Sequence, residues 1–410
     1  MRLLIVSQYF WPEGFRINDI VLAMVERGVE VEVLTGKPNY PEGHIYPGYR
    51  VWGCTEEMFH GATVHRVPLP PRGKGSTLGL ALNYLSFIFF GLVPGSWLLR
   101  GKQFDTILVY GLSPILQAIP ALFIGWLKRT PVVVFVQDLW PESMAATGYV
   151  KNKYALGLVE EVVRFIYRHV DLLLVQSEAF AGPVRAMAGE TPVEYYPNSA
   201  DPSFALPPTV PVENIPALGQ GFSVVFAGNI GTAQAVEVIV DAATLLREHD
   251  DLQFVVVGDG SRRDWMLEQA EARGLSNVHL PGRRPMEMMP GLFEKASALL
   301  VTLTDQPIFA QTVPTKVQAY MAAGRPILAC LRGEGARLVV AAEAGLAVPV
   351  EDASALAEAV LELKNLPDEA REEMGRNGRA YCREHFDHER LMDRLAERLG
   401  TLSRNGAHRP

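Results

Sequence analysis

Cysteine is scarce in this 410-residue sequence, which contains three, Cys54, Cys330 and Cys382, far apart in the chain. So few thiols at such spacing exclude a disulfide framework and a cysteine-based zinc site, and they are typical of a reducing compartment. The first residues form a short apolar strand and lack the successive regions of a signal peptide. We therefore expect a cytoplasmic protein.

Positive charge is in deficit, because 38 Lys and Arg residues face 46 Asp and Glu residues and leave a net charge of −8. This balance argues against nucleic acid as a partner, since nucleic-acid-binding domains are normally basic. Hydrophobic residues make up 48% of the chain, and its length exceeds one typical core. The composition therefore predicts a globular protein of two domains.

Charged residues are missing altogether between residues 76 and 99, where leucine and phenylalanine dominate. The stretch is long enough to cross a bilayer, but Asn83, Pro94 and several glycines interrupt it. A spanning helix would also place the preceding part of the first domain across the membrane from the following strand, so we reject it. Two explanations remain: a buried crossover helix, or a helix whose outer face enters the membrane interface. We favour the second.

Strands and helices alternate along both halves of the sequence, which predicts an α/β fold with parallel sheets. A proline-rich stretch without periodicity, residues 207–218, marks the best domain boundary. We expect two Rossmann-like domains facing a cleft, with a C-terminal helix that returns to the first domain. The expected ranges are 1–205, 206–385, 386–404 for the returning helix and 405–410 for a tail.

The first half carries two candidate site segments, although the loop after its first strand lacks the G-x-G-x-x-G dinucleotide fingerprint. Gly14 lies in that loop, at the carboxyl end of the strand, where open α/β sheets bind ligands. A second strand runs into residues 137–143, in which Asp138 and Trp140 crowd the strand end. A plain loop glycine, a helix cap and a packing tryptophan are the alternative explanations for these three residues.

Glycine-rich strand ends recur in the second half, where they allow a ligand's phosphates to approach backbone N–H groups. The predicted helix from Pro314 to Gly324 adds a candidate anion site. Thr315 is placed to cap this helix and Lys316 lies in its first turn. Backbone N–H groups and the helix dipole favour a phosphate in front of such a helix. An ordinary crossover helix with a solvated lysine explains the same residues equally well.

Taken together, these motifs resemble the GT-B glycosyltransferases, and the second half resembles family 4, the retaining nucleotide-sugar transferases. The first half looks like a bacterial subgroup that builds O-antigen and capsule repeat units, including N-acetyl-L-fucosamine transferases. The resemblance covers essentially the whole chain, and the ordered set of motifs is more specific than any one of them. The motifs are residues 7–13, 137–143, 228–231, 258–260, 282–285 and 313–326.

The resemblance implies that the second domain holds a UDP-sugar, with no cofactor and no metal, since the sequence lacks a D-x-D pair. It implies that Lys316 and the turn of Gly228, Asn229 and Gly231 hold the diphosphate and that Gly282-Arg283 meets the base. We select Asp138 and Glu142, with Glu13 as a weaker candidate, to position acceptor or sugar hydroxyls. The donor-binding residues expected from the resemblance are Gly14, Gly228, Asn229, Gly231, Gly258, Gly282, Arg283, Pro314, Thr315 and Lys316.

The sequence departs from the family pattern in three respects, at five positions. Asn229 and Gln234 stand where the family usually carries an arginine and a lysine, and Gln137 replaces a frequent histidine. The E-x7-E carboxylates of the family correspond to Gln311 and Ala319. These replacements shift charge neutralisation onto Lys316, Arg283 and the helix N-terminus.

The expected activity is retaining transfer of an N-acetylated hexosamine, such as N-acetyl-L-fucosamine, from UDP to a polyprenyl-diphosphate-linked saccharide. The protein would lie on the inner face of the plasma membrane and use the apolar region 76–99 to contact it. A UDP-sugar 2-epimerase of the same fold and a non-catalytic nucleotide-sugar-binding scaffold remain as alternatives. The epimerase is disfavoured because few acid and base residues lie at the predicted cleft.

Overall fold

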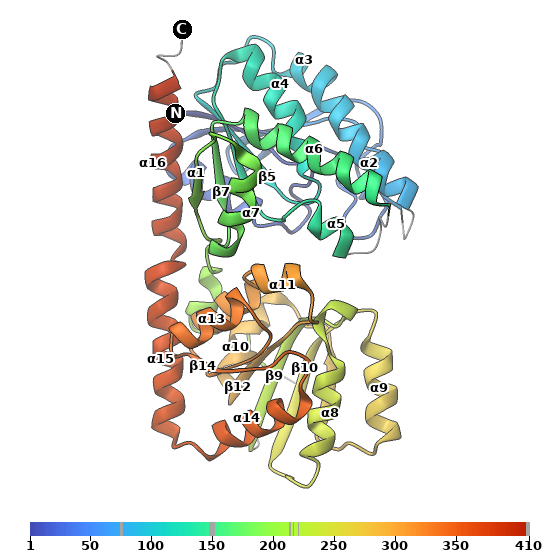
Figure 1. The fold of residues 1–410 in the computed structure, drawn as a ribbon, viewed down its shortest axis with the longest axis vertical. Coiled ribbons are helices and arrows are strands. Elements are labelled where there is room, and N and C mark those ends of the chain that lie inside the picture. The colour runs from blue at the N-terminus through green and yellow to red at the C-terminus, as the bar shows by residue number, and fades with distance from the viewer. Residues whose placement is uncertain (74–76, 147–151, 213–214, 216, 220, 407–410) are drawn as a thin grey trace. The chain divides into compact units, whose positions relative to one another are not determined.

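The computed structural model describes the chain apart from residues 74–76, 147–151, 213–214, 216, 220 and 407–410. The chain divides into two compact units. The first unit comprises Met1–Tyr196 and Glu389–Pro410, and the second comprises Pro197–His388. Each unit contains one β-sheet with helices packed against it (Figure 1).

The first unit is built on an eight-stranded sheet in the order β3-β4-β2-β1-β5-β6-β7-β8, parallel except where β3 pairs with β4. β1, β5 and β6 lie at its centre and are apolar runs, as expected of parallel strands buried on both faces. The strands are β1 (Arg2–Val6), β2 (Glu30–Thr35), β3 (Thr55–Phe59), β4 (Ala62–Arg66), β5 (Thr106–Gly111), β6 (Val132–Val136), β7 (Leu172–Val175) and β8 (Val193–Tyr195).

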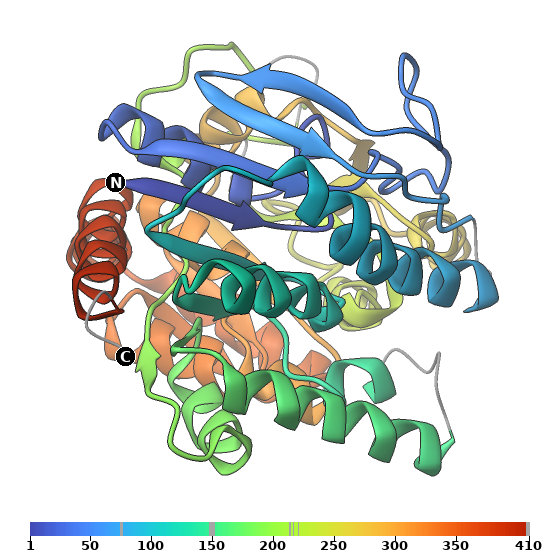
Figure 2. The same ribbon diagram turned by 90° about the horizontal axis from the view of Figure 1, so that it is seen from above.

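Helices cover both faces of this sheet (Figure 2). α1 (Ile17–Glu26) and α16 (His388–Gly406) share a hydrophobic core with β1, β2 and β5 on one face. The opposite face carries, side by side, the helical segment Thr77–Leu98, then α4 and then α6. The remaining helices of the unit are α2 (Thr77–Phe90), η1 (Gly91–Gly95), α3 (Ser96–Leu98), η2 (Ile115–Gln117), α4 (Ala118–Lys128), α5 (Glu142–Ala146), α6 (Lys153–His169) and α7 (Glu178–Ala188).

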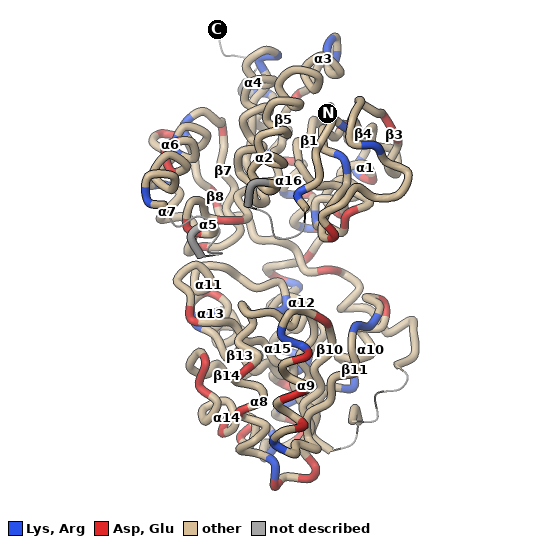
Figure 3. Tube along the Cα trace, turned by 90° about the vertical axis from the view of Figure 1, so that its right-hand side faces the viewer, with Lys and Arg blue, Asp and Glu red and all other residues tan. Residues whose placement is uncertain are grey.

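The continuous helical segment formed by α2, η1 and α3 is free of charged residues, as the uncoloured tube of α2 shows (Figure 3). Residues Gly79–Leu98 are long and apolar enough to cross a membrane, with a mean hydropathy of 1.4. However, β4 precedes this segment and β5 follows it, and both strands belong to the same sheet. The segment therefore lies against the sheet, and Gly91 and Gly95, which interrupt its apolar sequence, are the points of close packing on Pro120 and Leu34.

The second unit is built on a six-stranded parallel sheet in the order β11-β10-β9-β12-β13-β14. Its strands are β9 (Phe222–Asn229), β10 (Leu252–Asp259), β11 (Val278–Gly282), β12 (Ala298–Thr302), β13 (Ile327–Cys330) and β14 (Gly345–Val348). Its helices are η3 (Pro202–Ala205), η4 (Thr232–Gln234), α8 (Glu237–Leu245), α9 (Arg263–Ala272), η5 (Met286–Met288), α10 (Met289–Lys295), α11 (Pro307–Gln311), α12 (Thr315–Ala323), α13 (Glu334–Ala341), α14 (Ala353–Asn365) and α15 (Asp368–His385). Two hydrophobic clusters, one on each face of the sheet, form its core.

The returning C-terminal helix is confirmed, because α16 buries Leu391, Leu395 and Leu399 in the core of the first unit. The Tyr196 hydroxyl donates a hydrogen bond to the carbonyl oxygen of Leu391 and fixes the helix to the end of β8. The predicted tail begins inside α16, and its residues 407–410 lie outside the described part of the chain.

Truncation of Leu395 to alanine should destabilise the first unit by about 2–5 kcal/mol, because it leaves a cavity under a fully buried helix face. The matched control is Glu397→Ala on the exposed face of the same helix, which should change stability by less than about 0.5 kcal/mol. Urea denaturation of the two variants provides the measurement. Equal midpoints would show that α16 does not stabilise this unit.

Candidate functional site

Glycines end three neighbouring strands of the second unit. Gly228 at the end of β9 is paired in register with Gly258 of β10, and Gly282 at the end of β11 is paired with Val257. Because parallel strands end at the same edge, these glycines form one surface at the carboxyl edge of the sheet. Helix α12 follows β12 and begins at this edge as well.

Gly228 and Gly258 are required by the close approach of their backbones. A Cβ atom on Gly258 would lie 1.8 Å from the carbonyl oxygen of Gly228, and its φ of +148° disfavours any side chain. A Cβ atom on Gly228, which has a φ of +138°, would lie 2.7 Å from Cε of Lys316. Gly258 therefore lets the two strand ends approach one another, and Gly228 leaves the room that the lysine side chain occupies.

Lys316 is a buried cation without a hydrogen-bond acceptor. Its Nζ lies 3.5 Å from the centroid of the Phe226 ring and is shielded from solvent, with no hydrogen-bond partner among the described residues. Burial lowers the pKa of this amine to about 7. A buried ammonium with two or three protons unused is costly unless an anion meets it. This edge of the sheet is therefore a candidate anion site.

The start of α12 differs in detail from the prediction. Pro314 is the N-cap residue and Thr315 is the first helical residue, so the prediction that the Thr315 side chain caps the helix is wrong. No side chain accepts a hydrogen bond from the first turn, which leaves the N–H groups of Thr315 and Lys316 without an intrahelical acceptor. Gly324 ends the helix with a left-handed φ of 68°, as predicted.

The turn after β9 is held by its own amides. Oε1 of Gln234 accepts hydrogen bonds from Nδ2 of Asn229 at 3.1 Å and from the backbone N–H of Gly231 at 3.2 Å. The two residues that replace the family cations therefore bind one another and shape the turn. Neither contributes positive charge, so Lys316 carries that role on this strand end.

Gly282 and Arg283 lie at the end of β11, the outermost strand. Gly282 has a left-handed φ of 79° with open space around it, and Arg283 is exposed. The backbone therefore turns sharply at this point and leaves the Arg283 side chain on the surface.

In the first unit, Asp138 lies just beyond β6 in a chain of hydrogen bonds. Nε1 of Trp140 donates to Oγ of Ser113 at 2.9 Å, and that hydroxyl donates to Oδ2 of Asp138 at 2.9 Å. Burial raises the pKa of the Asp138 carboxyl, while the Ser113 hydrogen bond opposes this shift. Glu142, by contrast, is exposed at the first position of α5. Asp138 is thus positioned by its neighbours, whereas Glu142 is not.

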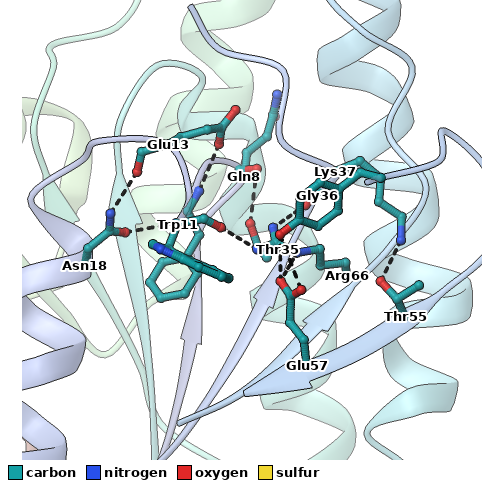
Figure 4. Close-up of polar contacts among 12 residues, drawn as sticks. Gln8, Trp11, Glu13, Asn18, Thr35, Gly36, Lys37, Thr55, Glu57 and Arg66 are labelled. Atoms are coloured by element: carbon teal, nitrogen blue, oxygen red, sulfur yellow. Dashed lines mark hydrogen bonds and ion pairs between the residues drawn. The ribbon is translucent and has the colours of Figure 1, made fainter. Parts of the chain in front are cut away.

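Glu13 lies in a polar cluster that holds the loops after β1 and β2 (Figure 4). Its Oε1 accepts the backbone N–H groups of Asn39 and Tyr40, both at 2.7 Å, and its Oε2 accepts that of Phe10 at 3.1 Å. Burial raises the pKa of this carboxyl to about 7, although the three N–H donors pull it back. Glu13 therefore holds loops together, and its predicted contact with substrate gains no support from these contacts.

A second anchor of the same loops is Arg66, which is fully buried. Its guanidinium donates to the carbonyl oxygens of Trp11 and Gly36 and forms an ion pair with Glu57 (Figure 4). Gly14, on the loop that these contacts hold, is exposed, and a Cβ atom there would touch nothing within 4 Å. Its predicted role in ligand binding stays a prediction.

Two protein-family models match the chain. Residues 14–199 match the model described as a glycosyl transferase 4-like domain, and residues 221–365 match glycosyl transferases group 1. Together they cover most of both units. The chain is a GT-B glycosyltransferase.

Curated relatives of this glycosyltransferase are named for colanic acid biosynthesis, for the O-antigen chain and for rhamnosyl transfer. A putative colanic acid biosynthesis glycosyl transferase, WcaI, from Escherichia coli is 26% identical over 79% of this chain and 82% of its own length. The O-antigen chain mannosyltransferase C of Escherichia coli is 27% identical over 43% of this chain and 46% of its own length. D-rhamnosyltransferase WbpZ from Pseudomonas aeruginosa is 29% identical over 39% of this chain and 40% of its own length.

Solved structures show the same fold. A sucrose-phosphate synthase from Thermosynechococcus elongatus has a TM-score of 0.73 at 18% identity, covering 98% of this chain and 99% of its own. Anabaena HepE in complex with UDP and glucose has a TM-score of 0.67 at 16% identity, covering 98% of this chain and 100% of its own. At this identity the likeness concerns the fold of the glycosyltransferase.

Sequence reasoning did not identify several residues that position this site in the glycosyltransferase. Phe226 underlies Lys316, and the Tyr320 hydroxyl accepts a hydrogen bond from the N–H of Ala227 at 3.1 Å. Ser113 connects Trp140 to Asp138. Ser113 follows a strand end, which was a usable signal. Phe226 and Tyr320 look like ordinary core residues, and only their contacts reveal the role.

Replacement of Glu13 by glutamine should loosen the loops after β1 and β2. The amide has one acceptor oxygen, so its NH2 group would face the N–H of Phe10, and we expect a loss of about 1–3 kcal/mol. Hydrogen exchange at Asn39 and Tyr40 should accelerate, whereas Glu42→Gln on the exposed surface should leave it unchanged. Unaltered exchange in Glu13→Gln would show that the carboxylate does not hold the loops.

Proposed function

We propose that this glycosyltransferase moves a sugar from a UDP-sugar to a polyprenyl-diphosphate-linked saccharide with retention of configuration, without a metal ion or other cofactor. The sugar suggested by the resemblance is an N-acetylated hexosamine such as N-acetyl-L-fucosamine. The proposal places the protein on the cytoplasmic face of the plasma membrane. The curated relatives in O-antigen and colanic acid synthesis support the pathway class.

The observation that carries the proposal is the unpaired, buried ammonium of Lys316 above Gly228. A diphosphate placed there would meet this cation together with the N–H groups of the first turn of α12, and both favour negative charge. Gly228 and Gly258 leave the strand ends bare, so phosphate oxygens can reach the backbone. The complex of HepE with UDP supports uridine diphosphate as the carrier.

In a retaining transfer, the bond between the anomeric carbon and the diphosphate oxygen breaks, and the acceptor oxygen bonds to the same face of that carbon. The acceptor's proton passes to the leaving diphosphate oxygen. Charge therefore develops on the diphosphate, and Lys316 and the helix N-terminus stabilise it most when the bond is breaking. Asp138, oriented by Ser113, would align the acceptor hydroxyl without acting as a strong base.

Contact with a membrane is supported by the outer face of the segment Thr77–Leu98. Its exposed apolar side chains recur at helical spacing, so they form one stripe, and Trp97 is 60% exposed. The inner face buries Phe87 and Asn83, the latter bonded to Gln8 at 2.7 Å, so the stripe cannot rotate inward. The stripe consists of Leu82, Leu85, Phe89, Val93 and Trp97. An exposed apolar stripe of this kind is typical of interfacial helices.

Replacement of Lys316 by methionine should weaken UDP binding about 10–100-fold, because one charge-assisted contact is lost. The wild-type affinity should fall as pH rises from 7 to 9, since the amine, with its pKa near 7, loses its charge over that range. Lys316→Arg keeps the charge and should flatten this pH dependence. Isothermal titration calorimetry with UDP measures all three proteins.

Unchanged UDP affinity in Lys316→Met would contradict the proposed diphosphate site. Binding of UDP without any transfer of sugar to lipid-linked acceptors would favour the non-catalytic scaffold. Interconversion of a UDP-sugar and its 2-epimer in the absence of acceptor would favour the epimerase.

Replacement of Asp138 by asparagine should lower kcat for transfer by at least tenfold while leaving UDP affinity unchanged, because the carboxylate acts on the acceptor side. Ser113→Ala should have a smaller effect in the same direction, since it removes only the hydrogen bond that orients Asp138. Glu142→Gln serves as the exposed control in the same segment. If Glu142→Gln lowers kcat as much as Asp138→Asn does, Asp138 does not have the proposed role.

A further inference from the structure

An open apolar trough of about 680 Å³ lies along the outer face of α4, and its lining includes none of the residues assigned to donor or acceptor. Ile119, Leu122 and Trp126 of α4 contribute to its lining, with Leu92 of η1 and Phe165 of α6 also lining it. α4 packs against both η1 and α6, which explains why a trough forms along the middle helix. Its volume falls in the range of ligand-binding pockets.

One end of the trough is polar and carries an unpaired cation. Arg129, which lines this end, follows α4 with a left-handed φ of 53°. Within the described part of the chain, its guanidinium forms no ion pair and no hydrogen bond. The neighbouring Lys128 is already engaged, because its Nζ donates to the carbonyl oxygens of Leu99 and Lys102. Positive segments thus lie at the ends of α3 and α4 (Figure 3).

The other titratable groups at this end are His169 and Asp171. Nδ1 of His169 bonds to the carbonyl oxygen of Phe165 at 2.7 Å and is thereby engaged with the backbone of α6. Asp171 accepts the N–H of Val132 at 2.8 Å and is thereby engaged with the backbone. An amphiphile with an anionic head and an apolar tail therefore matches the arrangement: the head at Arg129 and the tail along α4.

The position of Arg129 in the sheet decides which amphiphile fits. Arg129 and Pro131 precede β6, whereas Asp138 follows it. Because a strand rises about 3.3 Å per residue, Arg129 and Asp138 lie at opposite ends of β6, roughly 20 Å apart. A lipid whose head lies at Arg129 therefore has its phosphate at the opposite sheet edge from the candidate acceptor site. Such a lipid is not the sugar acceptor.

We propose that the trough over α4 binds one anionic glycerophospholipid of the membrane, with its phosphate on Arg129 and one acyl chain along Leu122 and Trp126. Trp126 is 74% exposed and stands at the boundary between the two parts of the ligand, where indole rings are favoured at membrane surfaces. The inference rests on the part of the proposed function that places the protein at a membrane surface. It adds a stoichiometric lipid site that selects anionic headgroups.

Native mass spectrometry and calorimetry with monomeric dioctanoyl phosphatidylglycerol, below its micelle concentration, test the site without nucleotide or acceptor. We expect one lipid bound per chain and at least tenfold weaker binding of dioctanoyl phosphatidylcholine. Arg129→Gln should reduce phosphatidylglycerol affinity at least tenfold, and Leu122→Trp, which fills the trough, should reduce the affinity for both lipids. Arg100→Gln is the matched control, because Arg100 stacks on Trp97 outside the trough.

Equal affinity for the two lipids, or equal effects of Arg129→Gln and Arg100→Gln, would overturn the proposal in favour of non-specific adsorption. Displacement of phosphatidylglycerol by farnesyl phosphate at lower concentration would also overturn it and assign the trough to the acceptor's tail. UDP affinity of the same variants is the control for folding, and we expect it to equal that of the wild-type protein. If the wild-type protein does not bind UDP, the proposed function is wrong, whereas the measured lipid affinities still decide the lipid site.

Discussion

The approach of β9 and β10 at Gly228 and Gly258 is the constraint on which the candidate donor site depends. A side chain on Gly258 would collide with the backbone of Gly228, and a side chain on Gly228 would collide with that of Lys316. The lysine Nζ is thereby shielded against Phe226, and none of the described residues accepts its protons. A bare strand edge, a helix N-terminus and an unpaired cation coincide there because β9 and α12 both meet the carboxyl edge of one sheet. Any larger residue at position 228 would displace the cation.

In the first unit, buried polar side chains hold loops together through hydrogen bonds, in contrast to Lys316. Glu13 accepts hydrogen bonds from backbone N–H groups of these loops, and Arg66 donates to a backbone carbonyl oxygen. Without these side chains, the backbone groups would be unpaired. Asn83 serves the same purpose from the helical side, because it bonds Gln8 at the end of β1 and the carbonyl oxygen of Pro70. These groups fix the loops at the carboxyl edge and connect them to α2. Asp138 lies in a smaller chain of hydrogen bonds through Ser113.

The helices over the first sheet expose large apolar side chains to solvent. Small residues such as Gly91 and Gly95 bring the backbone close to Pro120 and Leu34, while the large side chains of the apolar stripe remain exposed. α4 continues this apolar surface with Phe123 and Trp126, whose rings lie 5.9 Å apart. Exposing this much apolar surface is unfavourable in water and favourable at a membrane. The trough and its unpaired arginine add specificity to that surface.

Much of the architecture follows from local sequence. Apolar runs of four to six residues between helical segments specify parallel strands, and glycines at strand ends mark the sheet edge that binds ligands. The returning helix was visible in the spacing of Leu391, Leu395 and Leu399. Lys316 was predicted as the cation of an anion site because it follows Pro314 at the start of a helix. The strands, the helices and the position of Lys316 in a first turn depend on neighbours in sequence, so the sequence by itself determined them, whereas the role of Lys316 in binding an anion stays a prediction.

Contacts between distant segments decided the rest. The sequence makes Glu13 a candidate for substrate contact, whereas only the tertiary structure shows that Asn39 and Tyr40 donate to its carboxylate. Phe226 and Tyr320 look like core residues in sequence and acquire their roles only beside Lys316 and Ala227. The trough needs α4 and its two neighbouring helical segments side by side, with Arg129 at one end. The sequence determined which elements form; tertiary packing decided which polar groups are already engaged and which remain unpaired, because engagement depends on partners far away in the chain.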